Sequence, residues 1–128
     1  MALSLKKILA FMPGGFLVTL SDVEIDIEDQ NQLRLNADGW LVDFDKRSQR
    51  VSYAGRLLTV FSAVECIDIQ HFVNGKRFEW WVLCLRLNGG RTRSIGRSID
   101  GAQISIVAAR AATAMGKKVC VTQRVGVL

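Results

Sequence analysis

The chain has little of what metal sites and nucleophilic sites require, because its 128 residues include one histidine, His71, and three cysteines. A hydrolase triad places a histidine between a nucleophile and a carboxylate. Asp68 lies three residues before His71 and therefore on the opposite face of a regular strand. The cysteines and the histidine also lack the paired spacing of zinc ligands. The sequence predicts no catalytic residue, no metal and no cofactor, and hence a protein that is not an enzyme.

Cysteines are too few, and their number is odd, for a disulfide framework. Cys66, Cys84 and Cys120 are far apart, and each lies inside an apolar run. Free cysteine is among the most often buried residue types. We therefore expect three reduced thiols and a reducing compartment, which predicts a cytoplasmic location.

Proline and charge are also scarce, with one proline and 23% charged residues against 49% hydrophobic ones. This composition excludes a disordered chain and is typical of one compact domain. We place that domain at residues 21–128. The apolar spacing of residues 3–12 predicts a short helix that ends before Pro13, so residues 1–20 would form a helix and a Pro-Gly-Gly connector. Its apolar face would dock on the domain, or alternatively on a membrane surface or a partner.

Most of what the sequence does contain is typical of strands. Apolar and polar residues alternate in "VEIDI", "QLRLN" and "WLVDFD", which predicts half-buried strands. The pair Asn74-Gly75 favours a type I′ hairpin. Residues 65–72 should therefore pair antiparallel with residues 77–87.

The second strand of that hairpin, "FEWWVLCLRL", is apolar on both faces. Trp80 and Trp81 point to opposite sides of a strand, so one face lines the core and the other needs separate cover. A large exposed apolar surface is typical of protein–protein contact sites. We predict a protein interface whose candidate residues are Phe78, Trp80 and Trp81.

The stretch "LNGGRTRSIGRSIDG", residues 87–101, has the glycines of a phosphate-binding loop but not its spacing. A P-loop has four residues between its first glycine and a Gly-Lys-Ser/Thr triplet. Here Gly90 and Gly96 enclose five, and Arg97 replaces the lysine. We interpret residues 88–90 as a hairpin turn that leads into a basic strand.

Basic residues gather in and around this stretch, whereas residues 22–45 are mostly acidic. An alternative function is therefore the binding of an anionic ligand, either nucleic acid or an acidic membrane surface. The candidate residues are Arg86, Arg91, Arg93 and Arg97. No aromatic stacking platform accompanies them in the sequence. The acidic and basic stretches of two copies could also face each other in a homodimer.

Helical periodicity begins near Ile99 and ends before Gly116, which predicts a C-terminal helix over about residues 99–115. Residues beyond it favour a short edge strand. The fold class predicted is α+β, mainly β: a strongly bent antiparallel sheet or a partly open barrel with this C-terminal helix and the short N-terminal one.

The order of these elements resembles the pleckstrin-homology-like (PH-like) domains of bacteria. The residues that carry the resemblance are "GRLLTVFSAVECIDIQ", "FEWWVLCLRLNGGRTRSIGRS" and "IDGAQISIVAARAATAMGKKV". The resemblance implies a bent sheet closed by a C-terminal helix and a non-catalytic domain that binds proteins, peptides or lipids. The basic loop of family members that bind phosphoinositides is replaced here by the acidic "EDQNQ" at residues 28–32. We expect a protein-interaction or scaffold domain whose partner is another protein or a second copy of the chain in a homo-oligomer.

Overall fold

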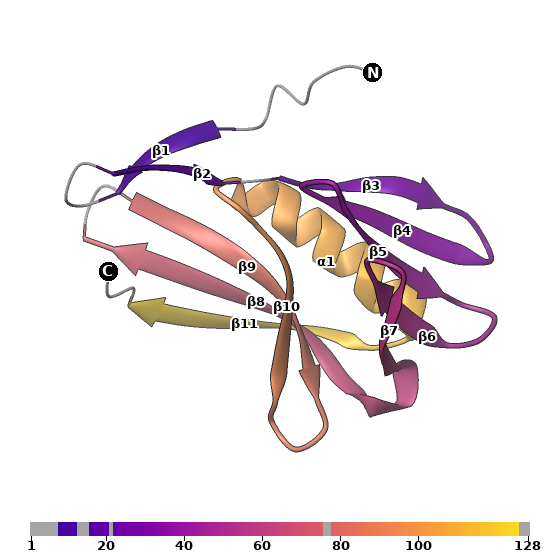
Figure 1. The fold of residues 1–128 in the computed structure, drawn as a ribbon. Coiled ribbons are helices and arrows are strands. Elements are labelled where there is room, and N and C mark those ends of the chain that lie inside the picture. The colour runs from indigo at the N-terminus through magenta and orange to yellow at the C-terminus, as the bar shows by residue number, and fades with distance from the viewer. Residues whose placement is uncertain (1–7, 13–15, 21, 76–77, 126–128) are drawn as a thin grey trace.

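A computed structural model describes residues 8–12, 16–20, 22–75 and 78–125 of the chain (Figure 1). Residues 23–60 form a five-stranded sheet in which each strand pairs antiparallel with the next. Its strands are β3 (Val23–Glu28), β4 (Gln32–Ala37), β5 (Trp40–Asp45), β6 (Arg50–Tyr53) and β7 (Arg56–Val60). The alternation read from the sequence is confirmed, because Leu33, Leu35, Val42 and Phe44 are buried on one face.

A second sheet has four strands in the order β10-β9-β8-β11. These are β8 (Val64–Asn74), β9 (Phe78–Leu87), β10 (Thr92–Ser98) and β11 (Lys118–Val125), and a 3₁₀ turn, η1 (Phe61–Ala63), precedes β8. The predicted pairing of β8 with β9 is confirmed. The predicted type I′ turn is wrong. Asn74 pairs with Phe78, so three residues connect the strands, whereas a type I′ hairpin has a loop of two.

The last strand corrects the expectation of a wholly antiparallel sheet. β11 runs parallel to β8, with Lys118 beside Cys66 and Val125 beside Val73. β10 also runs parallel to β8, because both are antiparallel to the intervening β9. A crossover between parallel strands needs a long connection, and helix α1 supplies it.

Helix α1 (Gly101–Met115) confirms the predicted C-terminal helix within two residues. Asp100 caps its start, since the carboxylate accepts a hydrogen bond of 3.1 Å from the Gln103 N–H. Gly116 ends it in the left-handed conformation, at φ 69°. Gly101 lies so close to the Trp81 ring that a Cβ there would be 2.6 Å from Cε2.

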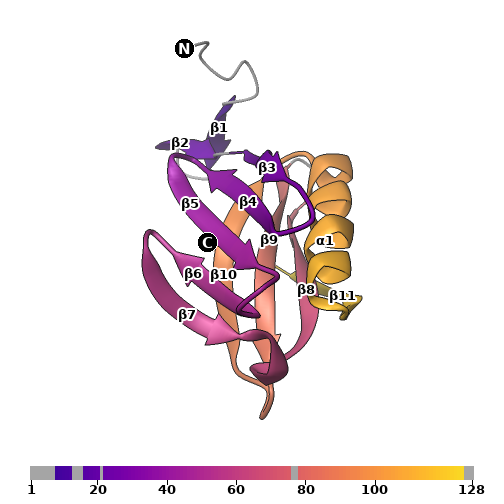
Figure 2. The ribbon, with the colours of Figure 1, turned by 90° about the vertical axis from the view of Figure 1, so that its right-hand side faces the viewer.

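The core lies where α1 meets both sheets. The helix contacts β8, β9 and β11 of one sheet and β3, β4 and β5 of the other, and Figures 1 and 2 show it running along one side of the two sheets. Small side chains at Ala108 and Ala111 are fully buried and allow this close approach. We call the face of the four-stranded sheet that meets α1 its inner face, and the opposite one its outer face.

The N-terminal helix predicted over residues 3–12 is wrong for the part that the structure describes. Ile8–Met12 is a strand, β1, paired antiparallel with β2 (Phe16–Leu20). Residues 3–7 and the Pro-Gly-Gly connector lie outside the described residues. The two runs are apolar and rich in branched and aromatic side chains, so pairing between them as strands outweighs the helical spacing.

The fold class α+β, mainly β, is confirmed. The strands form the five-stranded sheet, the four-stranded sheet and the β1–β2 pair, and the described residues do not close into a barrel. No helix in the described ranges has the length and apolar character needed to cross a membrane.

Candidate functional site

Trp80 and Trp81 lie on opposite faces of the four-stranded sheet. Trp81 is on the inner face, where its ring stacks on His71 at 4.5 Å between centroids and packs against the core. The start of α1 covers it, as the contact with Gly101 shows. Trp81 is therefore half-buried and packed against the core.

Trp80 lies on the outer face in a row of three rings. Its ring stacks on Phe72 of the neighbouring strand β8 at 5.1 Å, and Phe78 lies 5.2 Å away in a tilted arrangement. All three side chains are half-buried. We call Phe72, Phe78 and Trp80 the aromatic row.

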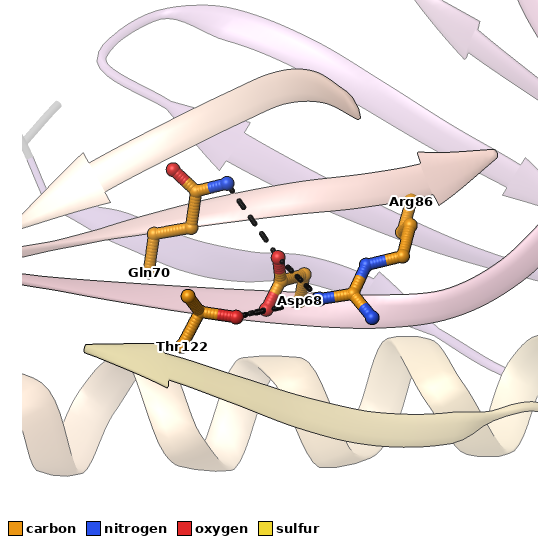
Figure 3. Close-up of polar contacts among 4 residues, drawn as sticks. All are labelled: Asp68, Gln70, Arg86 and Thr122. Carbon is orange, nitrogen blue, oxygen red and sulfur yellow. Dashed lines mark hydrogen bonds and ion pairs between the residues drawn. The ribbon is translucent and has the colours of Figure 1, made fainter. Parts of the chain in front are cut away.

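Further along the outer face, a buried carboxylate ties three strands together (Figure 3). Asp68 of β8 is 1% exposed. It accepts hydrogen bonds from Arg86 of β9 at 3.0 Å and from Thr122 of β11 at 3.1 Å. Gln70 approaches the same carboxylate at 3.5 Å. We call Asp68, Gln70, Arg86 and Thr122 the polar cluster.

Two thiols beside this cluster are held in the protonated form. Burial, followed by the neighbouring Cys120 thiol, raises the pKa of Cys66 to about 12. Burial and the Asp68 carboxylate raise the pKa of Cys84 to about 11. Since the thiolate is the nucleophile, neither cysteine is activated. The three cysteines are free, as the sequence predicts.

The turn at residues 88–90 confirms the hairpin interpretation. The Leu87 N–H donates to the Arg91 carbonyl at 2.7 Å, and Thr92 pairs with Arg86. Gly89 and Gly90 both have φ near +90°, which favours glycine. The loop reverses the chain between two paired strands.

The four candidate arginines do not form one patch. Arg86 belongs to the polar cluster, where its hydrogen bond to Asp68 raises the pKa of its guanidinium. Arg91 and Arg93 are exposed near the hairpin turn. Arg97 is exposed beyond a bulge in β10 at Ile95. The register places Arg93 and Arg97 on opposite faces of β10.

Gly96, the other glycine of the phosphate-loop alternative, serves packing between the sheets. A Cβ at this position would lie 2.5 Å from Val23 Cγ2 and 3.3 Å from the Ala37 Cβ. Only a glycine lets β10 approach β3 and β4 this closely. The bulge before this glycine shifts the register, so that Arg97 pairs with Val82.

A pocket of about 290 Å³ opens beside Gly96, between β10 and the β4–β5 turn. We call it the intersheet pocket. Its walls combine aromatic, acidic and basic side chains: Asp22, Ala37, Asp38, Trp40, Tyr53, Ser94, Ile95, Gly96 and Arg97. Trp40 is 57% exposed and stacks on Tyr53 with 6.3 Å between ring centroids.

Sequence reasoning missed the aromatic wall of this pocket. Trp40 has the same strand parity as the buried Val42 and Phe44, so the pattern marks it as a core residue. The strand begins at Trp40, beyond the reach of the core, and the ring is left open. The signal in the sequence was the position of Trp40 directly after Gly39, which places it beside a turn at the start of the strand.

The sole histidine makes structural contacts. His71 Nε2 lies 2.8 Å from Glu79 Oε2, while the ring stacks on Trp81. Among the described residues, no group of three or more His, Cys, Asp or Glu side chains is arranged to hold a metal ion.

Comparison of the chain with protein-family models, with curated proteins and with solved structures finds no match. The resemblance to PH-like domains therefore stays a prediction.

Proposed function

We propose that the chain is a non-catalytic binding domain that associates with a second copy of itself through the aromatic row. The observation that supports this is the position of Trp80. Its large ring lies on the outer face of the sheet, stacked on Phe72 with Phe78 tilted beside it, whereas Trp81 packs against the core on the inner face. Half-buried aromatic rings in a row are typical anchors of protein interfaces.

A two-fold axis brings the same surface of two copies together, and an apolar row is complementary to itself under that symmetry. Offset stacking between the rings of the two copies would bury the edges that water now reaches. Because each ring is already half-covered, the surface gained is modest. We therefore expect a weak, concentration-dependent dimer at the small end of interface sizes.

The neighbouring chemistry supports binding over catalysis. The thiols of Cys66 and Cys84 stay protonated, and Asp68 is engaged by the polar cluster. The His71 ring is engaged by Glu79 and by Trp81. Three free thiols also suit a reducing compartment such as the cytoplasm.

Sedimentation velocity of Trp80→Ala over a wide concentration range tests the proposal. The unchanged chain should shift from monomer to dimer as concentration rises, and Trp80→Ala should stay monomeric while keeping its melting temperature within a few degrees. Trp40→Ala is the matched control, because that ring is exposed but lies outside the aromatic row. Trp81→Ala should lose stability, as a core truncation does, by about 3–5 kcal/mol.

A chain that remains monomeric at every concentration contradicts the proposal. So does a dimer that Trp80→Ala leaves intact, because the contact surface would then lie elsewhere on the molecule.

A further inference from the structure

We propose that the intersheet pocket binds single-stranded nucleic acid, with one base stacked on Trp40 and the adjoining phosphate held by Arg97. This goes beyond self-association, because the pocket lies between the two sheets and shares no residue with the aromatic row.

Trp40 supplies a stacking platform of the kind that the arginine-rich stretch lacks in the sequence. Its side chain is 57% exposed, and Tyr53 packs nearly parallel to it, at 15° between ring planes. Tyr53 thereby fixes the indole before any ligand arrives. Bases stack on exposed aromatic rings whatever their identity, since every base has a π-face.

Arg97 supplies the positive charge on the same pocket. Its side chain is exposed, lines the pocket and forms no ion pair with any residue that the structure describes. Arg91 and Arg93 are exposed as well, but they lie on the opposite face of this edge strand, so a ligand held by Arg97 reaches them only by passing over the strand edge. Phosphate contacts by arginine are charge-assisted and frequently bidentate. Reaching arginines on both faces of β10 takes a ligand longer than one nucleotide, which favours a polymer.

The acidic wall orients the ligand. Asp22 is 8% exposed; its Oδ1 accepts from the Ser98 hydroxyl at 2.9 Å, and its Oδ2 is buried with no hydrogen-bond partner among the residues that the structure describes. An acceptor left without a donor is costly inside a protein. A carboxylate repels phosphate but accepts from the amino group of cytosine or adenine. The base therefore points toward Asp22 and the phosphate toward Arg97.

The size of the pocket agrees with a single base. Its volume of about 290 Å³ is at the lower end of ligand pockets, which run from roughly 300 to 1,000 Å³. Contacts to flanking nucleotides would then be made by the arginines outside the pocket. Thymine and uracil lack the exocyclic amino group, so we expect weaker binding of strands that contain only these bases.

Fluorescence anisotropy with labelled 12-residue oligodeoxycytidine and oligodeoxythymidine, at about 50 mM salt, tests the inference. Trp40→Ala and Arg97→Gln should each weaken binding of oligodeoxycytidine by about tenfold or more. The matched controls are Ile106→Ala, which removes an equally exposed apolar side chain on α1, and Arg47→Gln, at the far end of β5. Both controls should bind as the unchanged chain does, and circular dichroism should show that all four variants fold.

Asp22→Asn tests the orientation. It should reduce the preference for oligodeoxycytidine over oligodeoxythymidine and leave binding of oligodeoxythymidine nearly unchanged. Free cytidine monophosphate should compete only at much higher concentration than the strand, which separates a polymer ligand from a nucleotide.

Four outcomes would overturn the inference. The first is that the chain shows no salt-dependent binding of the oligonucleotide. The second is that Arg47→Gln and Arg97→Gln weaken this binding equally, and the third is that Trp40→Ala does not weaken it. The fourth is that heparin binds as tightly as the oligonucleotide and that Trp40→Ala leaves heparin binding unchanged. The first shows no nucleic-acid affinity, and the others show attraction to any polyanion. None of them bears on dimer formation, which sedimentation measures separately.

Discussion

Gly96 of β10 lies directly against Val23 of β3, at a distance where a Cβ on residue 96 would be 2.5 Å from Val23 Cγ2. Real Cβ atoms do not approach other heavy atoms this closely, so a side chain here forces the two sheets apart. The contact joins segments that are 73 residues apart in the chain.

Gly96→Ala should therefore destabilise the protein by about 1–3 kcal/mol, the usual cost of overpacking. The shift in the urea midpoint measures it. Val23→Ala removes the clashing methyl group, so the double variant Gly96→Ala/Val23→Ala should be more stable than the two separate losses predict. Strictly additive losses would show that the sheets do not meet at this point.

The polar cluster leads to a second prediction. Asp68→Ala removes the acceptor shared by Arg86 and Thr122 and leaves the Arg86 guanidinium with the Thr122 hydroxyl, at 3.3 Å, in place of a carboxylate. Thr122→Val keeps the shape of the side chain and loses a hydroxyl that donates to the Asp68 carboxylate and accepts from Arg86, which costs about 1.5–3 kcal/mol. We expect Asp68→Ala to lower the urea midpoint clearly more than Thr122→Val does.

Combining the two substitutions should cost less than their sum, because each of them alone already removes the hydrogen bond between the Thr122 hydroxyl and Asp68. Additive costs would contradict a shared cluster.

The cysteines lead to a third prediction, on reactivity and on pH. A disulfide reagent at pH 8 should modify the half-exposed Cys120 first, and Cys66 and Cys84 only after unfolding. Mass spectrometry of the labelled peptides identifies the order. Labelling of Cys84 at the same rate as Cys120 would contradict its burial.

The sign of the pH effect follows from the same thiols. Their pKa values in the folded chain, about 12 and about 11, lie above the ordinary value of 9.0. Between pH 9.0 and the raised pKa of each thiol, that thiol loses its proton in the unfolded chain and keeps it in the folded chain. Stability is therefore fully present below pH 9 and falls as the pH rises toward 12. Cys84→Ala should show a shallower decline over this range than the unchanged chain.

Local patterns in the sequence predict much of this fold, because they depend on neighbouring residues. Alternation marks the strands around Leu33 and Phe44, and the glycine pair at Gly89 marks a hairpin. The helix is found from its period and from its cap, Asp100. In each case the signal and the structure lie within a few residues of each other.

Long-range relationships are what the sequence does not reveal. Whether β11 adds to the edge beside β8, and in which direction, depends on where α1 delivers the chain. The arginines look like one group in the sequence, yet the pleat and a bulge at Ile95 divide them. Trp40 becomes part of a pocket with Arg97 only because a sheet folded from other residues brings them together.

Helix α1 connects β10 and β11, the two outermost strands of the four-stranded sheet, and crosses β9 and β8 to do so. The helix is therefore covalently connected to both edge strands of this sheet. Detaching either edge strand would displace the helix and expose the core beneath it. Partial unravelling from one side is for this reason disfavoured, and the sheet and its helix should come apart as a single cooperative unit.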